Sequence, residues 1–198
     1  MDIVKVNKVI LEINELAKKI GIERVIEEYD DVIIEINNPY ISYGYCVITK
    51  GKTKRFKENE KIVLNAEDPE LSYYFCVGVD GADVPAHGKV VLKSKNSHFN
   101  LLFMRDVKGA DVPAHEKLIL ESGDAKDNYY TSLYIKTCDK KAHEKVVLDS
   151  KDAEANYLYE HNIKGADVEA HKQVIHESHN PIYNKLLEIE ANTRNKTI

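Results

Sequence analysis

The sequence predicts an all-α fold, a right-handed α-solenoid of about six helical hairpins followed by a C-terminal capping helix. Three observations lead to this prediction: a repeat of constant length, helix-capping side chains at fixed places in each copy, and apolar columns at helical spacing. The repeat is visible in the segments VDGADVPAHGKVVLKSKN, VKGADVPAHEKLILESGD and IKGADVEAHKQVIHESHN. Because such units bury their apolar faces against their neighbours, residues 1–198 are expected to form a single α-solenoid domain.

The repeat keeps a period of 28 residues along most of the chain. One histidine stands in each copy at this step: His87, His115, His143 and His171. A column of Asp or Asn keeps the same step: Asp68, Asn96, Asp124, Asp152 and Asn180. Asn38 lies 30 residues before Asp68, because the first copy carries a longer loop, GKTKRFKEN. A spacing this constant indicates a structural unit.

Each Asp or Asn of that column is expected to cap a first helix, since its side-chain oxygen can accept a hydrogen bond from an orphan amide of the first turn. Proline follows directly at three of these positions, as it often does at the first helical residue: Pro39, Pro69 and Pro181. We expect the first helices to end at glycines that suit a left-handed residue: Gly81, Gly109 and Gly165.

An Asp two residues after each of these glycines, and at the equivalent position of the remaining copy, is expected to cap a second helix: Asp83, Asp111, Asp139 and Asp167. These helices contain KVVLKS, KLILES, KVVLDS and QVIHES. A strand interpretation of the apolar triplets fails, because their flanks carry helix caps and no hairpin signal separates neighbours. The unit is therefore helix, tight turn, helix. Thr137 to Lys141 lacks the glycine turn, so a bend or irregular spacing is expected there.

The two ends differ from the interior copies, as capping units of a stacked array do. Residues 1–37 are expected to form a diverged N-terminal capping pair with Gly21 at its bend. The repeats then occupy residues 38–180, and residues 181–198 form the C-terminal cap.

Charge and cysteine usage exclude several classes of protein. With 33 acidic against 28 basic side chains the formal net charge is −5, which argues against general nucleic-acid binding. The three cysteines are an odd number without CxxC spacing, so they indicate neither a disulfide framework nor a zinc knuckle. We expect a cytoplasmic protein, in the host cytoplasm if it is viral, with no signal peptide, membrane span or cofactor.

The histidine column is expected to be a structural ladder, with neutral imidazoles hydrogen-bonded to backbone, Asp or Ser groups. Equivalent positions on stacked helices lie about 8 to 10 Å apart, too far to share one metal ion. A functional histidine ladder is the alternative. A second alternative is a surface metal site in the cluster that departs from the repeat: His161, His176, Glu177 and His179. A lost leucine in the last copy explains that cluster equally well, so no metal site is predicted.

Two kinds of residue are candidates for contact with a partner. The column Ser72, Asn100, Asn128 and Asn156 is interpreted as an inter-repeat hydrogen-bond ladder; alternatively it lies partly exposed beside tyrosines on a concave face. Tyrosines combine contact area with hydrogen bonding, and positions that vary between copies can encode a partner. The predicted partner-binding residues are Tyr74, Arg105, Asp106, Tyr130, Tyr134, Tyr159, His161 and Asn162.

The copies resemble HEAT-like helical-hairpin repeats, and RDVKGADVPAHEK resembles a short-repeat group found in hypothetical proteins of low-GC bacteria and their phages. GADV also resembles ankyrin repeats, but their TPLH signature is missing and their unit is about 33 residues long. The resemblance to HEAT-like repeats covers about residues 38 to 180, and it implies a fold without an assigned activity.

No nucleotide-binding loop or catalytic triad motif is present in the sequence. We therefore expect a non-enzymatic protein-binding module, in a narrower form a phage or mobile-element inhibitor of a host protein such as a defence-system component. The alternatives are a HEAT-like nucleic-acid-processing enzyme similar to a DNA glycosylase, and a self-associating scaffold that forms homo-oligomers.

Overall fold

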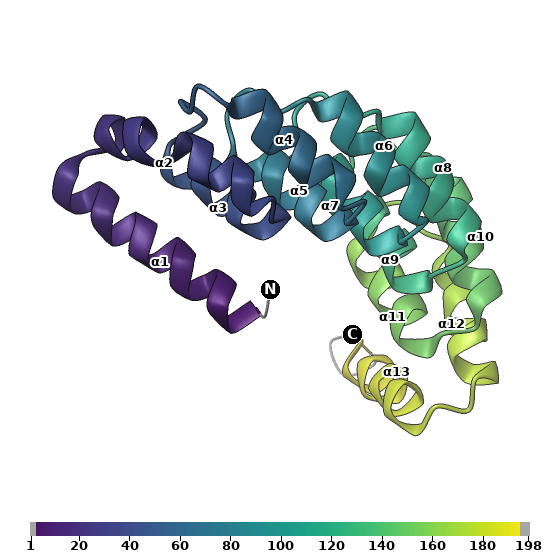
Figure 1. The fold of residues 1–198 in the computed structure, drawn as a ribbon. Helices are drawn as coiled ribbons and strands as arrows, with labels where there is room; N and C mark the ends of the chain where they lie inside the picture. The colour runs from purple at the N-terminus through teal and green to yellow at the C-terminus, as the bar shows by residue number, and fades with distance from the viewer. Residues whose placement is uncertain (1–2, 195–198) are drawn as a thin grey trace. The chain divides into compact units, whose positions relative to one another are not determined.

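The computed structural model describes residues 3–194, and within them it contains helices and turns but no strand (Figure 1). The all-α prediction is therefore confirmed for this part of the chain. The residues group into two compact units, Met1–Asp111 and Val112–Ile198, and each is described by itself below. The last four residues of the predicted C-terminal cap, 195–198, lie outside the described residues.

The first unit contains helices α1 (Ile3–Ile20), α2 (Ile22–Ile36), α3 (Pro39–Ile48), α4 (Phe56–Asn65), α5 (Pro69–Gly78), α6 (Val84–Ser94) and α7 (Ser97–Asp106). Helix α3 packs against α4, and α5 packs against α6, so adjacent helices form pairs. Helix α5 also contacts α3 and α7, while α6 contacts α4, which stacks the pairs in two layers. The predicted opening pair is α1 and α2, which meet at Gly21 with φ at +92°.

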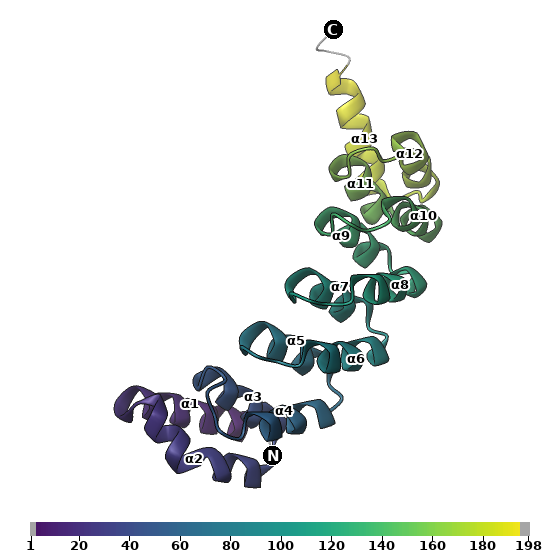
Figure 2. The same cartoon turned by 90° about the horizontal axis from the view of Figure 1, so that it is seen from above.

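The second unit contains helices α8 (Val112–Ser122), α9 (Ala125–Tyr134), α10 (Lys140–Ser150), α11 (Ala153–Asn162), α12 (Val168–Glu177) and α13 (Pro181–Arg194). Here α9 pairs with α10 and α11 with α12, as Figure 2 shows. Helix α11 contacts both α9 and α13, while α10 contacts both α8 and α12. The predicted terminal helix is α13.

The predicted helix caps are present in both units. The side chains of the Asp or Asn column accept backbone N–H groups of the first turn at Asn38, Asp68, Asn96, Asp124, Asp152 and Asn180. The second helices α6, α10 and α12 begin in the same way at Asp83, Asp139 and Asp167. Since one such cap stabilises a helix by about 1 kcal/mol, the column sets where most helices start.

The first helices end earlier than the glycines predicted to close them. Helices α5, α7 and α11 are followed by Val79, Val107 and Ile163, which are extended and buried. The extended backbone ends each helix, and the glycine lies two residues later in the turn, with φ between +82° and +91°. Ile135 has the same extended conformation after α9, and α10 begins at Lys140 in the usual register. The irregular spacing expected at Thr137 to Lys141 is therefore absent.

The longer loop of the first copy is held by a buried carboxylate. Asp30 of α2 is only 7% exposed, and it accepts hydrogen bonds from Tyr45 Oη (2.6 Å), Thr53 Oγ1 (2.5 Å) and the Lys54 amide (2.9 Å). Burial and this carboxylate raise the pKa of the Tyr45 phenol. The longer loop thus places Thr53 and the Lys54 amide against Asp30 of α2.

Candidate functional site

A ladder of buried amide and imidazole groups runs through the second unit. Asn156 is fully buried, and its Nδ2 donates to the carbonyls of Val147 (2.9 Å) and Asp152 (2.8 Å). Because both amide protons are donated to carbonyls, Oδ1 is the atom that faces His171 Nδ1, 2.7 Å away. It accepts a hydrogen bond from the Nδ1–H group. Asn128 and His143 form the same arrangement, with 2.6 Å between Oδ1 and Nδ1. The inter-repeat ladder is confirmed for these residues, and their exposure on a concave face is excluded.

A glutamate contacts the histidine of each of these Asn–His pairs, and we call each Asn–His–Glu set a rung of the ladder. His171 Nε2 lies 3.3 Å from Glu144 Oε1, and the same oxygen accepts the amide of Asp167 at 2.6 Å. Glu116 lies in the same way against His143 (3.3 Å) and the amide of Asp139 (2.6 Å). The side-chain partners of these imidazoles are thus Asn and Glu, and not the Asp, Ser or backbone groups that we expected.

The rung in the first unit is incomplete. Ser72 occupies the repeat position of Asn128 and Asn156, and its side chain is too short to reach the imidazole of His87. Among the described residues, neither Ser72 Oγ nor the two ring nitrogens of His87 has a hydrogen-bond partner, although both residues are fully buried. His87 Nε2 lies 3.7 Å from Glu60 Oε1, which itself accepts the Asp83 amide. Burial lowers the pKa of His87 more than Glu60 raises it, so this imidazole is neutral at pH 7.

Replacing Ser72 by asparagine is expected to stabilise the protein by about 1 to 2 kcal/mol, because the longer side chain can accept the His87 Nδ1 proton as Asn156 accepts that of His171. Urea unfolding of wild type and Ser72→Asn measures the change. Ser72→Ala is the control and is expected to lie within about 0.5 kcal/mol of wild type. If the asparagine variant were less stable than the alanine variant, the proposed rung would not fit at this position.

An apolar surface is exposed on the first helices of the first unit. Val77 and Tyr74 on α5 are 52% and 45% exposed, and Val47 on α3 is 39% exposed. A Cβ added at Gly78 would lie 3.5 Å from Val47 Cγ2 and 3.4 Å from the Tyr43 hydroxyl. The exposed surfaces of α3 and α5 are therefore adjacent, and we call Val47, Tyr74 and Val77 the α3–α5 face.

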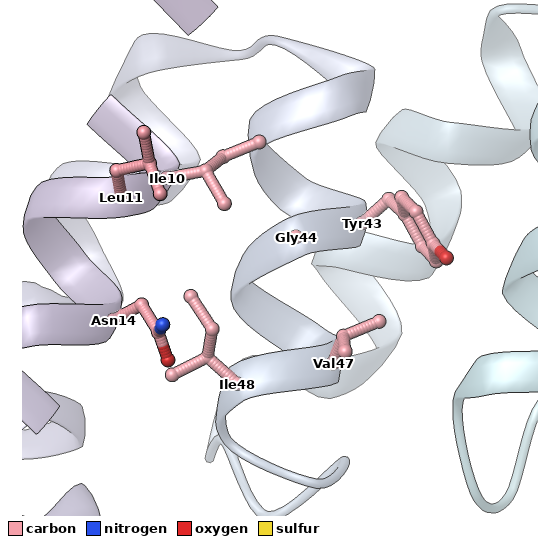
Figure 3. A pocket seen from close by; sticks show the side chains of 7 residues that line it. All are labelled: Ile10, Leu11, Asn14, Tyr43, Gly44, Val47 and Ile48. Atoms are coloured by element: carbon pink, nitrogen blue, oxygen red, sulfur yellow. The ribbon is translucent and has the colours of Figure 1, made fainter. Parts of the chain in front are cut away.

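A groove of about 330 Å³ adjoins this face. Figure 3 shows its lining: Ile10, Leu11 and Asn14 from α1, and Tyr43, Gly44, Val47 and Ile48 from α3. The two helices approach closely at Gly44, where an added Cβ would lie only 2.8 Å from Ile10 Cδ1. Val47 belongs to both features, so the groove extends the α3–α5 face toward α1.

The second unit also exposes tyrosines on a first helix. Tyr130 and Tyr134 of α9 are 36% and 49% exposed, and their rings stack with centroids 5.9 Å apart and an interplanar angle of 6°. Leu133 lies between them in the sequence and is 37% exposed. Tyr74, Tyr130 and Tyr134 thus have the exposure that the sequence interpretation required of contact residues.

Other predicted contact residues are engaged within the chain. Arg105 Nε donates to Asp106 Oδ1 at 2.7 Å, and the Tyr73 hydroxyl donates to Asp106 Oδ2 at 2.7 Å. The prediction that Tyr159 is exposed is wrong. Its side chain is fully buried, and its hydroxyl donates to the Lys140 carbonyl at 2.8 Å, because this aromatic column points between α11 and α10.

The two remaining candidates, His161 and Asn162, lie at the end of α11. His161 Nε2 is 3.0 Å from Glu190 Oε1, and Asn162 Nδ2 donates to the Leu158 carbonyl at 2.8 Å. His176 instead bonds Asn184 Oδ1 through Nδ1, 2.8 Å away. Among the described residues, the two groups of potential metal ligands are Glu116–Cys138–His143 and Glu160–His161–Glu190. Neither includes His176 or His179, so the structure does not assemble the alternative site considered from the sequence.

The cysteines are poor nucleophiles in this environment. Burial raises the pKa of Cys46 and Cys76 to about 12 and that of Cys138 to about 11. At neutral pH the three thiols are therefore protonated, whereas nucleophilic attack requires a thiolate.

Within residues 3–194 no helix is both long and apolar enough to cross a membrane. In comparisons with known proteins, the chain matches no family model, no curated protein and no solved structure.

Proposed function

We propose that this chain is a non-enzymatic helical-repeat protein that binds another protein through the α3–α5 face. The supporting observation is the exposure of Val47, Tyr74 and Val77 beside the apolar groove lined by α1 and α3. Tyrosine is typical of the buried centres of protein interfaces, and exposed apolar patches on otherwise polar proteins often mark binding sites. The net charge of −5 favours a protein partner over a phosphate backbone.

The finer architecture that goes with this proposal is a right-handed α-solenoid of about six hairpins with a capping helix, in which first helices present the contact residues. The narrower proposal, a cytoplasmic phage or mobile-element inhibitor of a host protein, rests on the resemblance to HEAT-like repeats of low-GC bacteria and their phages. A partner found among defence-system components would support it.

Replacing Tyr74 and Val77 together by serine is expected to reduce binding of the partner at least tenfold, because the variant removes two exposed anchors. Circular dichroism verifies that the fold survives the loss of the Tyr74 contact with Tyr73. The measurement is affinity capture with the purified chain as bait, followed by quantification of each captured protein. The control is Lys61→Ser with Lys89→Ser, which changes exposed positions on α4 and α6. The proposal predicts at least one protein that the control retains and the Tyr74/Val77 variant loses.

The same purified proteins also test the two alternative functions. Salt-dependent binding of duplex DNA by wild type would favour the nucleic-acid-processing alternative. Dimers in light scattering that the Tyr74/Val77 variant abolishes would favour the self-associating scaffold. Capture that is equal for the variant and the control would contradict the α3–α5 face as the binding surface.

A further inference from the structure

The contact between Glu116 and His143 brings two electron-pair donors together. Asn128 donates both amide protons to backbone carbonyls, so its Oδ1 accepts a hydrogen bond from His143 Nδ1–H. The neutral imidazole then has a bare lone pair on Nε2, which lies 3.3 Å from Glu116 Oε1. A carboxylate also has only lone pairs to offer, so the two atoms together present a pair of ligands to a cation.

The second unit contains the same pair twice, with one difference. His171 Nε2 also lies 3.3 Å from Glu144 Oε1, and Asn156 sets its tautomer in the same way. The difference lies in the turn before the second helix of each copy. The copy with His143 has Cys138 at the position where the other copies have alanine, at Ala82, Ala110 and Ala166. The pair at His171 offers two ligands, whereas the thiol beside His143 supplies a third ligand of a kind that selects metals.

The three ligand atoms already lie close to the arrangement of a tetrahedral site. Glu116 oxygen, Cys138 Sγ and a His143 nitrogen all lie within 4.8 Å of one another. Nitrogen and oxygen ligands bound tetrahedrally to zinc are separated by about 3.3 Å, so Nε2 and Oε1 need not move, and only Cys138 Sγ has to come closer. His143 is fully buried, while the Glu116 side chain is 15% exposed, so an ion can enter from the Glu116 side.

We propose that Glu116, Cys138 and His143 bind one zinc ion, with the fourth position left to water or an added ligand. Zinc accepts nitrogen, sulfur and oxygen donors of these kinds, and its sites with three protein ligands keep an open fourth position. Binding exchanges the thiol proton for the metal: the S–H bond breaks, the proton leaves to solvent and the Zn–S bond forms. The ion would join α8 to the turn before α10 and to α10 itself.

The test uses the untagged, full-length chain, reduced with a phosphine, and cobalt(II) as the spectroscopic substitute for zinc. Wild type is expected to bind one equivalent of cobalt with a thiolate-to-cobalt charge-transfer band, and zinc is expected to displace it. Cys138→Ala, which restores the alanine of the other copies, is expected to lose the band and at least tenfold in affinity. Cys76→Ala is the matched control and should keep both, and circular dichroism verifies that each variant is folded.

Ala166→Cys provides a gain of function that unfolding cannot imitate. It places a thiol beside Glu144 and His171, which have the same separation as Glu116 and His143, so cobalt binding should rise from one equivalent to two. Wild type without a charge-transfer band, or Ala166→Cys that remains at one equivalent, would overturn the proposal. Unchanged cobalt affinity in Cys138→Ala would also overturn it.

Discussion

Replacing Asn156 by alanine is expected to destabilise the protein by about 3 to 5 kcal/mol. The substitution removes donation to the carbonyls of Val147 and Asp152 and leaves the Nδ1 proton of His171 without its acceptor inside the fold. An unsatisfied buried donor costs about 1 to 3 kcal/mol in addition to the bonds lost, and the smaller side chain leaves a cavity. Urea unfolding followed by circular dichroism measures the change.

The matched control is Asn162→Ala, in the same helix. Asn162 is exposed, and its side chain donates to the Leu158 carbonyl and to the Tyr129 hydroxyl, so its loss is expected to cost less than about 1 kcal/mol. Asn156→Ser, which reproduces the residue at position 72, should lie between the two. If Asn156→Ala cost no more than Asn162→Ala, the buried amide would not hold neighbouring helices together.

Acidification from pH 7.5 to 5.5 in the presence of a chelator is expected to destabilise the protein through His87 and His171. Burial lowers the pKa of both imidazoles in the folded chain, more than the nearby carboxylates raise it. The unfolded chain therefore binds more protons below the ordinary pKa of about 6.5, and stability falls as the pH drops through that value. Between its unfolded and folded pKa, each histidine lowers the free energy of unfolding by up to about 1.4 kcal/mol for each pH unit of acidification. Urea unfolding at several pH values measures this slope.

The control for this pH dependence is His87→Asn, because Asn59 occupies the same column in the preceding copy. Asparagine does not titrate, so the variant should lose about one histidine's share of the slope. A slope that is the same in wild type and His87→Asn would show that His87 is not the group that takes up a proton on unfolding.

The period and the caps made most of the fold predictable from the sequence. An N-cap side chain acts on amides two or three residues away, so Asp68 or Asp152 marks a helix start without knowledge of the tertiary structure. The spacing of the histidines then specifies the unit, and the inward position of His171 follows from the apolar residues around it. These local rules predicted where most helices begin, the opening pair with its bend at Gly21, and the buried asparagine column.

The rest depended on contacts that local rules do not contain. The ends of α5 and α11 are set by Val79 and Ile163, which turn inward to be buried, and not by the glycines that follow. The role of the glutamate column was missed because Gly88 and Lys172 interrupt Glu60, Glu116 and Glu144 in the sequence. Tyr159 shares a helix with residues that are exposed, and only the packing of α11 on α10 shows that it is buried.

The most direct test of the ladder is the tautomer of His171, read from long-range nitrogen–carbon-bound proton correlations in NMR at pH 7.5. Nδ1 is expected to carry the proton, because Asn156 presents only its oxygen to the ring. A ring protonated at Nε2 alone would mean that Asn156 does not accept from His171, and would contradict the hydrogen-bond ladder from which the stability and metal-site predictions are derived.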